Sequence, residues 1–290
     1  MMTDKQKNFV TRTLTSIAYV LVLVGCIAQP NPLPYCLLFV VITGMTTWEF
    51  GTVINKNLNL QVNRFITTVA SCYLFYAMFA YNINSQGSEV FIPYLITVIY
   101  LFVSELYIDR EQSLQNWAFT MMSQMYVALP FACINLMAFV ATPYSIAYLP
   151  ELVLAVFVFL WCSDAGAYIV GSLIGKHKLF PRVSPGKTWE GSIGGGIIAV
   201  LVSQGVAFFF NDTFAAENST ANYLCWAGLA LVVTVFGTWG DLVESLFKRK
   251  LGIKDSGKIL PGHGGMLDRF DSAILAFPAA VVYIYTITLI

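Results

Sequence analysis

Charge is scarce in this sequence. Only 11% of the 290 residues are charged, whereas 57% are hydrophobic; an ordinary soluble domain carries charge on roughly a quarter of its residues. The formal net charge is zero, so no overall electrostatic field favours binding to nucleic acid. This composition is typical of an integral membrane protein.

Residues that hold zinc or form disulfides are also few. The chain has two histidines, His177 and His263, and its six cysteines are scattered singly through apolar runs without a Cys-x-x-Cys pair. This distribution argues against a thiolate zinc site and against a disulfide framework. We interpret the cysteines as small buried apolar residues.

Long hydrophobic runs are abundant. From Leu14 onward they recur at close to the ~20 residues needed to cross a bilayer, which predicts spanning helices rather than the alternating strands of a barrel. We predict an all-α polytopic membrane protein with about nine transmembrane helices, the fifth kinked at Pro130. The predicted helices cover residues 14–28, 35–54, 65–81, 90–108, 119–140, 151–174, 192–210, 223–247 and 268–290.

Lysine and arginine occur only in every second connection of this arrangement. The connections that contain them are the segment before the first helix and residues 55–64, 109–118, 175–191 and 248–267, with Arg269 at the very start of the ninth helix. The connections without them are residues 29–34, 82–89, 141–150 and 211–222. Because basic residues collect on the cytoplasmic side, we predict a cytoplasmic N-terminus, an outside C-terminus and two long cytoplasmic loops.

Polar residues that can carry chemistry are concentrated after about residue 150. We therefore divide the chain into a scaffold, residues 1–149, and a catalytic part, residues 150–290. Asp164 lies among small residues near the cytoplasmic end of the sixth predicted helix. An ionisable group inside a span indicates a functional site, although small neighbours would also suit a packing seam that holds one hydrogen-bonded carboxylate.

Two further pairs of acids have i,i+3 spacing, which places each pair on one helix face. Asp241 and Glu244 lie near the end of the eighth helix, and Asp268 and Asp271 lie at the start of the ninth. Pairing of Glu244 with Lys248, or helix capping by one aspartate, would explain part of this pattern. However, the two helices bracket one loop, so the four acids can converge on a site whose hard oxygen ligands suit Mg²⁺.

Cations and glycines surround these acids in the sequence. Glycines beside His263 allow a tightly folded backbone whose N–H groups approach a phosphate, and the loop before the seventh helix offers donors at a helix start. The residues concerned are Gly262, Gly264 and Gly265 in the later loop, and Ser184, Lys187 and Thr188 in the earlier one. The Gly-Lys-Thr at residues 186–188 is not a phosphate-binding Walker loop, because the upstream glycine is missing and no strand is predicted before it.

The basic residues near these turns can be interpreted in two ways. The basic residues can be ordinary cytoplasmic charges, or they can bind phosphates, and their coincidence with glycine turns and acids favours phosphate binding. The candidates are Lys187, Lys248, Arg249, Lys254 and Arg269. Acids for a divalent metal, cations for phosphates and glycine donors together predict phosphoryl or nucleotidyl transfer between a soluble nucleotide and an anionic lipid.

The long second loop resembles the signature of phosphatidate cytidylyltransferases, a family also called CDP-diacylglycerol synthases. The matching positions are Ser245, Lys248, Arg249, Lys254, Asp255, Leu260, Pro261, His263, Gly264, Gly265, Asp268, Arg269, Phe270 and Asp271. Residues 163–168, 184–191 and 240–245 also resemble bacterial members. The resemblance is close over residues 161–271; over the first half it rests on the number of spans and on Trp48-Glu49-Phe50.

The resemblance implies a reaction and a site. CMP would pass from CTP to phosphatidic acid, giving CDP-diacylglycerol and pyrophosphate, at the cytoplasmic face of a bacterial inner membrane in phospholipid biosynthesis. Mg²⁺, paired with a second cation such as K⁺, would lie on Asp241, Asp268 and Asp271, and a homodimer would be the assembly. Glu244 would support the metal site, and the substrate would be contacted by Asp164, Ser184, Lys187 and Thr188. The phosphates would be bound by Lys248, Arg249, Lys254 and Arg269. The turn that holds the triphosphate would consist of His263, Gly264 and Gly265.

Two other functions stay open at the level of sequence. A related CTP-dependent enzyme that acts on another lipid, such as a lipid kinase or another CDP-lipid synthase, would use similar polar loops. A transporter or ion channel would also place acids inside a helix bundle. A transporter should place them at the midplane, between repeated halves with broken helices, whereas these acids lie at one cytoplasmic edge.

Overall fold

A computed structural model of the chain describes residues 4–108, 110–141, 146–210, 213–214, 219–257 and 264–288. The described residues form two compact units. The first comprises the chain up to Tyr148 together with Lys250–Phe270, and the second comprises Leu149–Arg249 together with Asp271–Ile290. One division thus coincides with the predicted boundary near residue 150, while the segment from Lys250 belongs with the first unit. The predicted scaffold and catalytic roles stay predictions.

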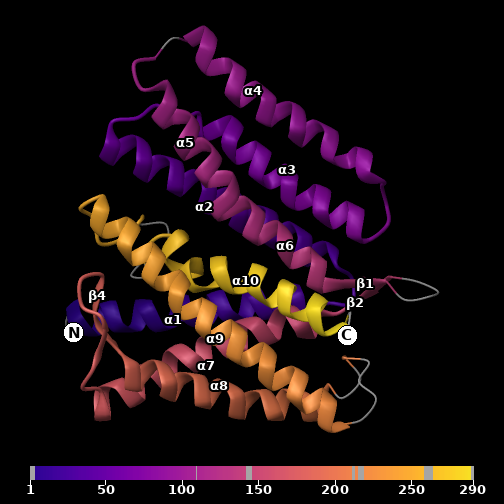
Figure 1. The fold of residues 1–290 in the computed structure, drawn as a ribbon, viewed down its shortest axis with the longest axis vertical. Helices are drawn as coiled ribbons and strands as arrows, with labels where there is room; N and C mark the ends of the chain where they lie inside the picture. The colour runs from indigo at the N-terminus through magenta and orange to yellow at the C-terminus, as the bar shows by residue number, and fades with distance from the viewer. Residues whose placement is uncertain are drawn as a thin grey trace. The chain divides into compact units, whose positions relative to one another are not determined.

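The first unit is a helix bundle in which α2, α3 and α6 pack side by side (Figure 1). An aromatic cluster around Tyr35 fills its centre, with Phe39, Phe75 and Phe79 among the rings in contact. Its elements are α1 (Asp4–Ile27), α2 (Leu33–Leu58), α3 (Arg64–Asn82), η1 (Ser88–Phe91), α4 (Ile92–Ile108), α5 (Ser113–Ser123), η2 (Gln124–Ala128), α6 (Leu129–Ala138), β1 (Phe139–Ala141) and β2 (Ile146–Tyr148).

The second unit is built on a close pair of helices, α7 and α8. A Cβ added at Gly195 of α8 would collide with the backbone carbonyl of Ser163 on α7, so this glycine lets the two backbones approach. The elements are α7 (Pro150–Ile174), β3 (Lys178–Phe180), β4 (Ser184–Thr188), α8 (Trp189–Phe209), α9 (Ser219–Lys250) and α10 (Leu267–Thr288), of which α9 ends and α10 begins in the first unit.

The all-α polytopic membrane fold is confirmed. Each of the nine predicted segments is helical over most of its described residues, and within the described residues seven helices are long and apolar enough to cross a membrane. They are Leu33–Leu58, Ser88–Ile108, Ser113–Ala138, Pro150–Ile174, Trp189–Phe209, Thr220–Lys250 and Leu267–Ile287. The apolar part of α1, Thr13–Ile27, is shorter, and α3 is not among the seven, so the count of nine spans and the sidedness of the termini stay predictions.

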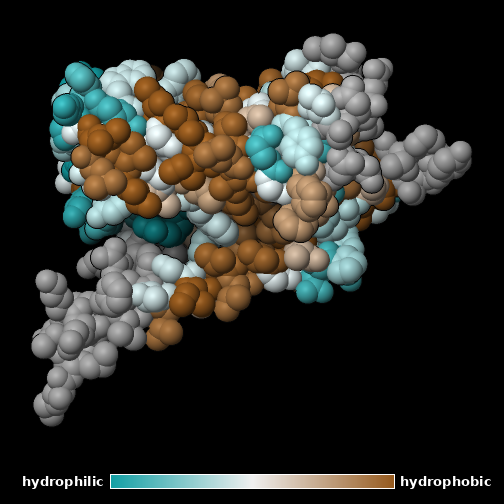
Figure 2. Space-filling model, turned by 90° about the horizontal axis from the view of Figure 1, so that it is seen from below, coloured by the Kyte–Doolittle hydropathy of each residue, from teal (hydrophilic) through white to brown (hydrophobic). Residues whose placement is uncertain are grey.

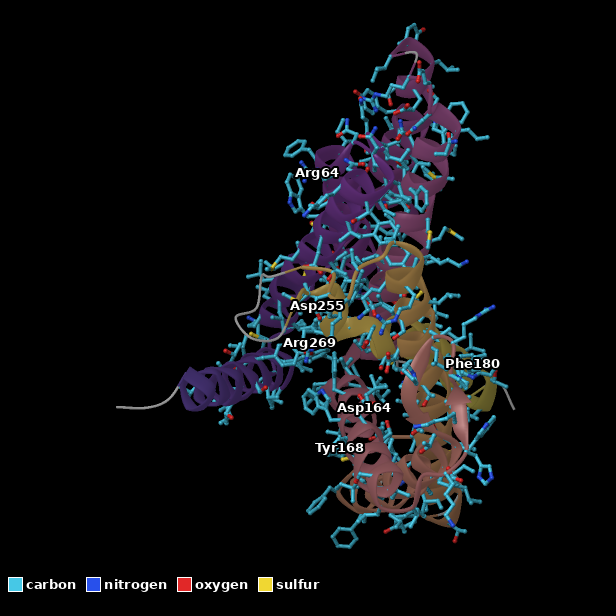
Figure 3. The ribbon with its side chains drawn as sticks, turned by 90° about the vertical axis from the view of Figure 1, so that its left-hand side faces the viewer. Arg64, Asp164, Tyr168, Phe180, Asp255 and Arg269 are labelled. Atoms are coloured by element: carbon cyan, nitrogen blue, oxygen red, sulfur yellow. The ribbon has the colours of Figure 1, made fainter. Side chains whose placement is uncertain are left out.

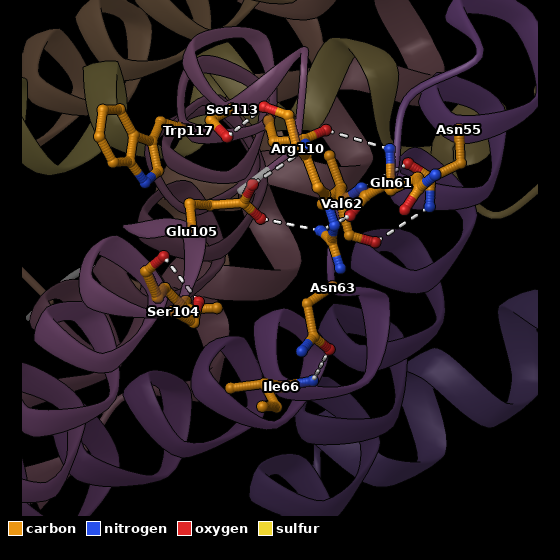
Figure 4. A network of polar contacts seen from close by, with 12 residues as sticks. Asn55, Gln61, Val62, Asn63, Ile66, Ser104, Glu105, Arg110, Ser113 and Trp117 are labelled. Atoms are coloured by element: carbon orange, nitrogen blue, oxygen red, sulfur yellow. Dashed lines mark hydrogen bonds and ion pairs between the residues drawn. The ribbon is translucent and has the colours of Figure 1, made fainter. Parts of the chain in front are cut away.

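The surface and the connections agree with a membrane setting. Hydrophobic residues cover most of the face shown in Figure 2, and hydrophilic residues gather mainly toward its margins. In the first unit, the connections before α3 and before α5 meet at one end, because Arg110 donates to the carbonyl of Gln61 at 2.5 Å and also pairs with Glu105 at 2.8 Å (Figure 4). These are two connections that were predicted to share the cytoplasmic side.

Local geometry departs from the prediction at two places. Two short antiparallel hairpins, β1–β2 and β3–β4, replace plain loops. The predicted kink at Pro130 takes the form of a π-helical turn, Gln124–Ala128, that separates α5 from α6. Because proline lacks an N–H, a wider turn before it accommodates the missing hydrogen bond without ending the helix.

Candidate active site

A cavity of about 480 Å³ in the second unit brings four predicted site residues together. Asp164 comes from α7, Lys187 and Thr188 from β4, and Asp241 from α9. Tyr168, one turn after Asp164 on the same helix, also lines it (Figure 3). The β3–β4 hairpin is the element that carries Lys187 back over the helices, since it joins the end of α7 to the start of α8.

The central contact of this cavity is an ion pair. Lys187 Nζ lies 2.5 Å from Asp241 Oδ2, and both side chains are about three quarters buried, with exposures of 24% and 27%. The Ser245 hydroxyl donates to Asp241 Oδ1 at 3.1 Å, which fixes the second carboxylate oxygen. A cation and an anion are therefore held at the wall of a polar cavity, where each can meet a charged ligand.

Thr188 connects the hairpin to α8. It is the N-cap residue of that helix, and its hydroxyl accepts a hydrogen bond from the Gly191 N–H at 3.2 Å. Glu190 holds the start of the other strand at the same end of the hairpin, because its carboxylate accepts the backbone N–H groups of Lys176 and His177 at 3.2 Å and contacts His177 Nδ1 at 2.5 Å. These contacts fix where Lys187 lies relative to α8.

Glu244 and Lys248 form an ion pair, which is one of the two interpretations that the sequence allows for Glu244. The Glu244 side chain is fully buried, and its Oε2 lies 2.5 Å from Lys248 Nζ one helical turn later. This contact gives the buried carboxylate a cationic partner. Metal binding by Glu244 and phosphate binding by Lys248 stay predictions.

Three aspartates of the second unit interact with one another and with two lysines. Asp271 interacts electrostatically with Asp241, Asp164 and Lys248, and Asp164 interacts with Lys187 and Asp241. With Glu244, four carboxylates face two ammonium groups, an excess of two negative charges when all are ionised. Carboxylate oxygens are hard ligands of the kind that Mg²⁺ prefers. Within the described residues, no three His, Cys, Asp or Glu side chains are arranged to hold a metal ion, so the metal ligands stay a prediction.

Asp268 belongs to a separate network in the first unit. Its Oδ2 accepts the backbone N–H of Ser256 at 2.9 Å and the Gly265 N–H at 2.8 Å, and it lies 2.9 Å from the Ser256 hydroxyl oxygen. Gly264 adopts a φ of +82°, the left-handed backbone that the glycine-rich sequence predicts. Gly264 and Gly265, the described residues of the predicted glycine turn, therefore lie beside Asp268.

The comparisons with known proteins point in one direction. A family model described as "Cytidylyltransferase family" matches residues 10–287. The chain belongs to the cytidylyltransferase family. Its relatives include proteins named phosphatidate cytidylyltransferase: that of Haemophilus influenzae is 30% identical over 281 residues, covering 92% of this chain and 95% of the relative. That of Staphylococcus aureus is 34% identical over 225 residues (76% and 81%), and that of Staphylococcus haemolyticus 41% over 194 residues (66% and 68%).

The other predicted site residues of this cytidylyltransferase lie outside the cavity or outside the described residues. Arg249, Lys254 and Arg269 are exposed, Arg269 on the first turn of α10 (Figure 3). Ser184 begins β4 and is not among the residues that line the cavity. His263 lies outside the described residues. Asp268 and Asp271 fall in different units, so the convergence of the two pairs of acids stays a prediction.

The sequence-based prediction gives no role to Glu49, although this residue accepts several hydrogen bonds in the fold. Glu49 on α2 is buried and accepts the backbone N–H groups of Met266 and Leu267 at 2.9 and 3.2 Å. An ionisable residue inside an apolar run was the signal that singled out Asp164. The same signal marks Glu49, which was noted only as part of Trp48-Glu49-Phe50.

Proposed function

We propose that this cytidylyltransferase transfers CMP from CTP to phosphatidic acid, forming CDP-diacylglycerol and pyrophosphate at the cytoplasmic face of a bacterial inner membrane. The observation that carries the proposal is the cavity in which Lys187 and Asp241 meet beside Asp164, in a unit otherwise made of apolar helices. A charged cavity in such a unit suits a reaction between a polar nucleotide and a lipid phosphate. The names of the relatives supply the substrates.

The chemistry requires little acid–base assistance. A phosphate oxygen of phosphatidic acid, already anionic, attacks the α-phosphorus of CTP, and the bond from that phosphorus to the oxygen bridging the β-phosphate breaks. The bonding electrons leave with pyrophosphate. The protein therefore needs to align the two phosphates and neutralise the charge that develops on the leaving group.

Lys187 is the residue placed to neutralise charge in the cavity. Its ammonium group is held at the cavity wall by Asp241 and can form charge-assisted hydrogen bonds to a phosphate oxygen. Lys248, Arg249, Lys254 and Arg269 are the further phosphate ligands in this proposal. His263, Gly264 and Gly265 provide the turn for the triphosphate, and Asp164, Ser184 and Thr188 complete the substrate contacts.

Mg²⁺ is the proposed cofactor, with K⁺ as a second cation. Asp241, Asp268 and Asp271 would hold the metal, and the buried Glu244 would support the site. When bound, Mg²⁺ supplies charge neutralisation at the phosphates. This assignment is supported by the group of four acids (Asp164, Asp241, Glu244 and Asp271), which interact with only two lysines, Lys187 and Lys248. We also propose a homodimer, which the family resemblance implies and a mass measurement in detergent would test.

Direct assay tests the proposal. Purified protein in detergent should convert CTP and phosphatidic acid into CDP-diacylglycerol and pyrophosphate in equal amounts, and chelation of Mg²⁺ should stop the reaction. The control replaces phosphatidic acid with diacylglycerol, which lacks the attacking phosphate and should give no nucleotide lipid. Folded protein that forms no CDP-diacylglycerol from any diacyl phosphatidic acid would contradict the proposed function.

A further inference from the structure

Glu49 is a carboxylate that the fold takes out of solvent and surrounds with hydrogen-bond donors. Its exposed fraction is 4%, and it lies in an apolar helix, α2. The Met266 N–H donates to Oε2 at 2.9 Å, the Leu267 N–H donates to Oε1 at 3.2 Å, and the Ser256 hydroxyl donates to Oε1. A buried carboxylate is costly unless donors replace its water, and these three donors do so.

All three donors come from one distant segment of the same unit. Met266 and Leu267 are 217 and 218 residues away in sequence, and they stand where α10 begins. The first N–H groups of a helix have no partner within the helix, and the helix dipole favours negative charge at that end. Glu49 therefore caps α10 from another helix, a role that a residue next to the helix start usually plays.

Two glycines make room for this contact. A Cβ at Gly257 would lie 2.5 Å from Glu49 Oε2, and a Cβ at Gly265 would overlap Oε1. Both distances are shorter than any real Cβ contact, so a side chain at either position would displace the carboxylate. The absence of a side chain at Gly257 and at Gly265 thus leaves space for the Glu49 carboxylate.

The cap is connected directly to Asp268. The Ser256 hydroxyl lies within hydrogen-bonding distance of both carboxylates, and Gly265, which packs against Glu49, donates its N–H to Asp268 at 2.8 Å. The groups that orient the Asp268 carboxylate are therefore the same groups that Glu49 holds. A change in the Glu49 contacts must shift Ser256 and residues 265–267, and Asp268 with them.

We propose that Glu49 is a positioning residue for nucleotidyl transfer: by capping α10 it fixes the orientation of Asp268. The inference rests on the proposed function, in which Asp268 is a metal ligand. It extends the site to α2, in the part of the chain that was predicted to be scaffold.

The test is Glu49→Gln, which keeps the size of the side chain but removes its charge and one acceptor oxygen. We expect kcat to fall by about 10²-fold, the loss typical of a misplaced reacting geometry, while KM for CTP and for phosphatidic acid stays near that of the wild type. Amide hydrogen exchange of the peptide containing Met266 and Leu267 should become faster, because their acceptor is weakened. This exchange measurement does not depend on activity.

Glu105→Gln is the matched control. Glu105 is a second buried glutamate of the first unit, 7% exposed, and its partners are Arg110 at 2.8 Å and Asn116 at 3.2 Å (Figure 4). Its replacement should lower the thermal unfolding midpoint but leave the kcat of the folded protein and the exchange at Met266 and Leu267 unchanged. Gly257→Ala is the second test variant, because it crowds Glu49 while leaving every carboxylate in place, and it should lower kcat as Glu49→Gln does.

Wild-type kcat or wild-type exchange in folded Glu49→Gln would overturn the proposal. If Glu49→Gln does not fold, wild-type kcat in Gly257→Ala would overturn it equally. An equal loss of kcat in Glu105→Gln would do the same, since it would reduce the effect to general destabilisation. A wild-type protein without activity would instead remove the proposed function, and the exchange measurement would still show whether Glu49 caps α10.

Discussion

At the scale of single residues, the proposed function depends on charged side chains that are distant in sequence and in contact in the fold. Lys187 and Asp241 are 54 positions apart and meet at 2.5 Å. An exposed pair of this kind contributes little to stability, but in a partly buried cavity the attraction between the two charges is less screened. A phosphate that reaches Lys187 competes with Asp241 for the ammonium group, so nucleotide binding and the freeing of a carboxylate are linked.

Lys187→Gln should therefore lower kcat/KM for CTP by about 10²- to 10³-fold, because a preorganised cation at the phosphates is lost. The thermal unfolding midpoint should change little, since Lys187 is not part of the apolar core. The matched control is Lys178→Gln on the neighbouring strand β3, which is exposed and does not line the cavity. Equal activity of the two variants would contradict the assignment of Lys187 to the phosphates.

At the scale of elements, the site requires helices to approach closely. Gly240, one residue before Asp241 on α9, faces α10: a Cβ there would lie 2.5 Å from the carbonyl oxygen of Asp271 and 3.0 Å from the Cα of Ser272. Because these are backbone atoms of α10, they could make room for a Cβ only if the helix moved. The glycine thus sets the spacing between the helices that carry Asp241 and Asp271.

Gly240→Ala should destabilise the protein by about 1–3 kcal/mol through overpacking and should reduce activity further by displacing one aspartate from the other. Gly205→Ala on α8 is the control, because nothing lies within 4 Å of a Cβ at that position. The control should be neutral or slightly stabilising, since alanine favours a helix. Thermal unfolding and turnover of both variants, measured in the same detergent, would test the expectation. Full activity in Gly240→Ala would show that this helix spacing is not needed.

The sequence predicts the helices well because a span must be apolar over a fixed length and its ends attract polar residues. It does not predict the β3–β4 hairpin, because Ser184–Thr188 contains proline and glycine and lacks the alternation of a strand. Nor does it predict that Glu49 caps α10, since no local pattern links residues more than 200 positions apart. The candidate site was predicted where acids and glycines cluster in sequence and at the single acid Asp164, whereas the single acid Glu49 was missed.

At the scale of the whole molecule, the family signature runs through both units. Ser245 to Arg249 and Asp271 belong to the second unit, and Lys250–Phe270 belongs to the first. The scaffold and catalytic roles of the two predicted parts stay predictions. In the structure, α2 of the first unit contacts the start of α10 through Glu49, and the second unit holds the cavity with Lys187 and Asp241.

The central claim is that the protein transfers a nucleotidyl group and not a phosphoryl group. CTP carrying radioactive phosphorus at the α-position, and separately at the γ-position, distinguishes the two with phosphatidic acid as acceptor. The account predicts that α-label appears in the lipid product and that γ-label appears only in pyrophosphate. Transfer of γ-label to the lipid would contradict it and would identify a lipid kinase instead.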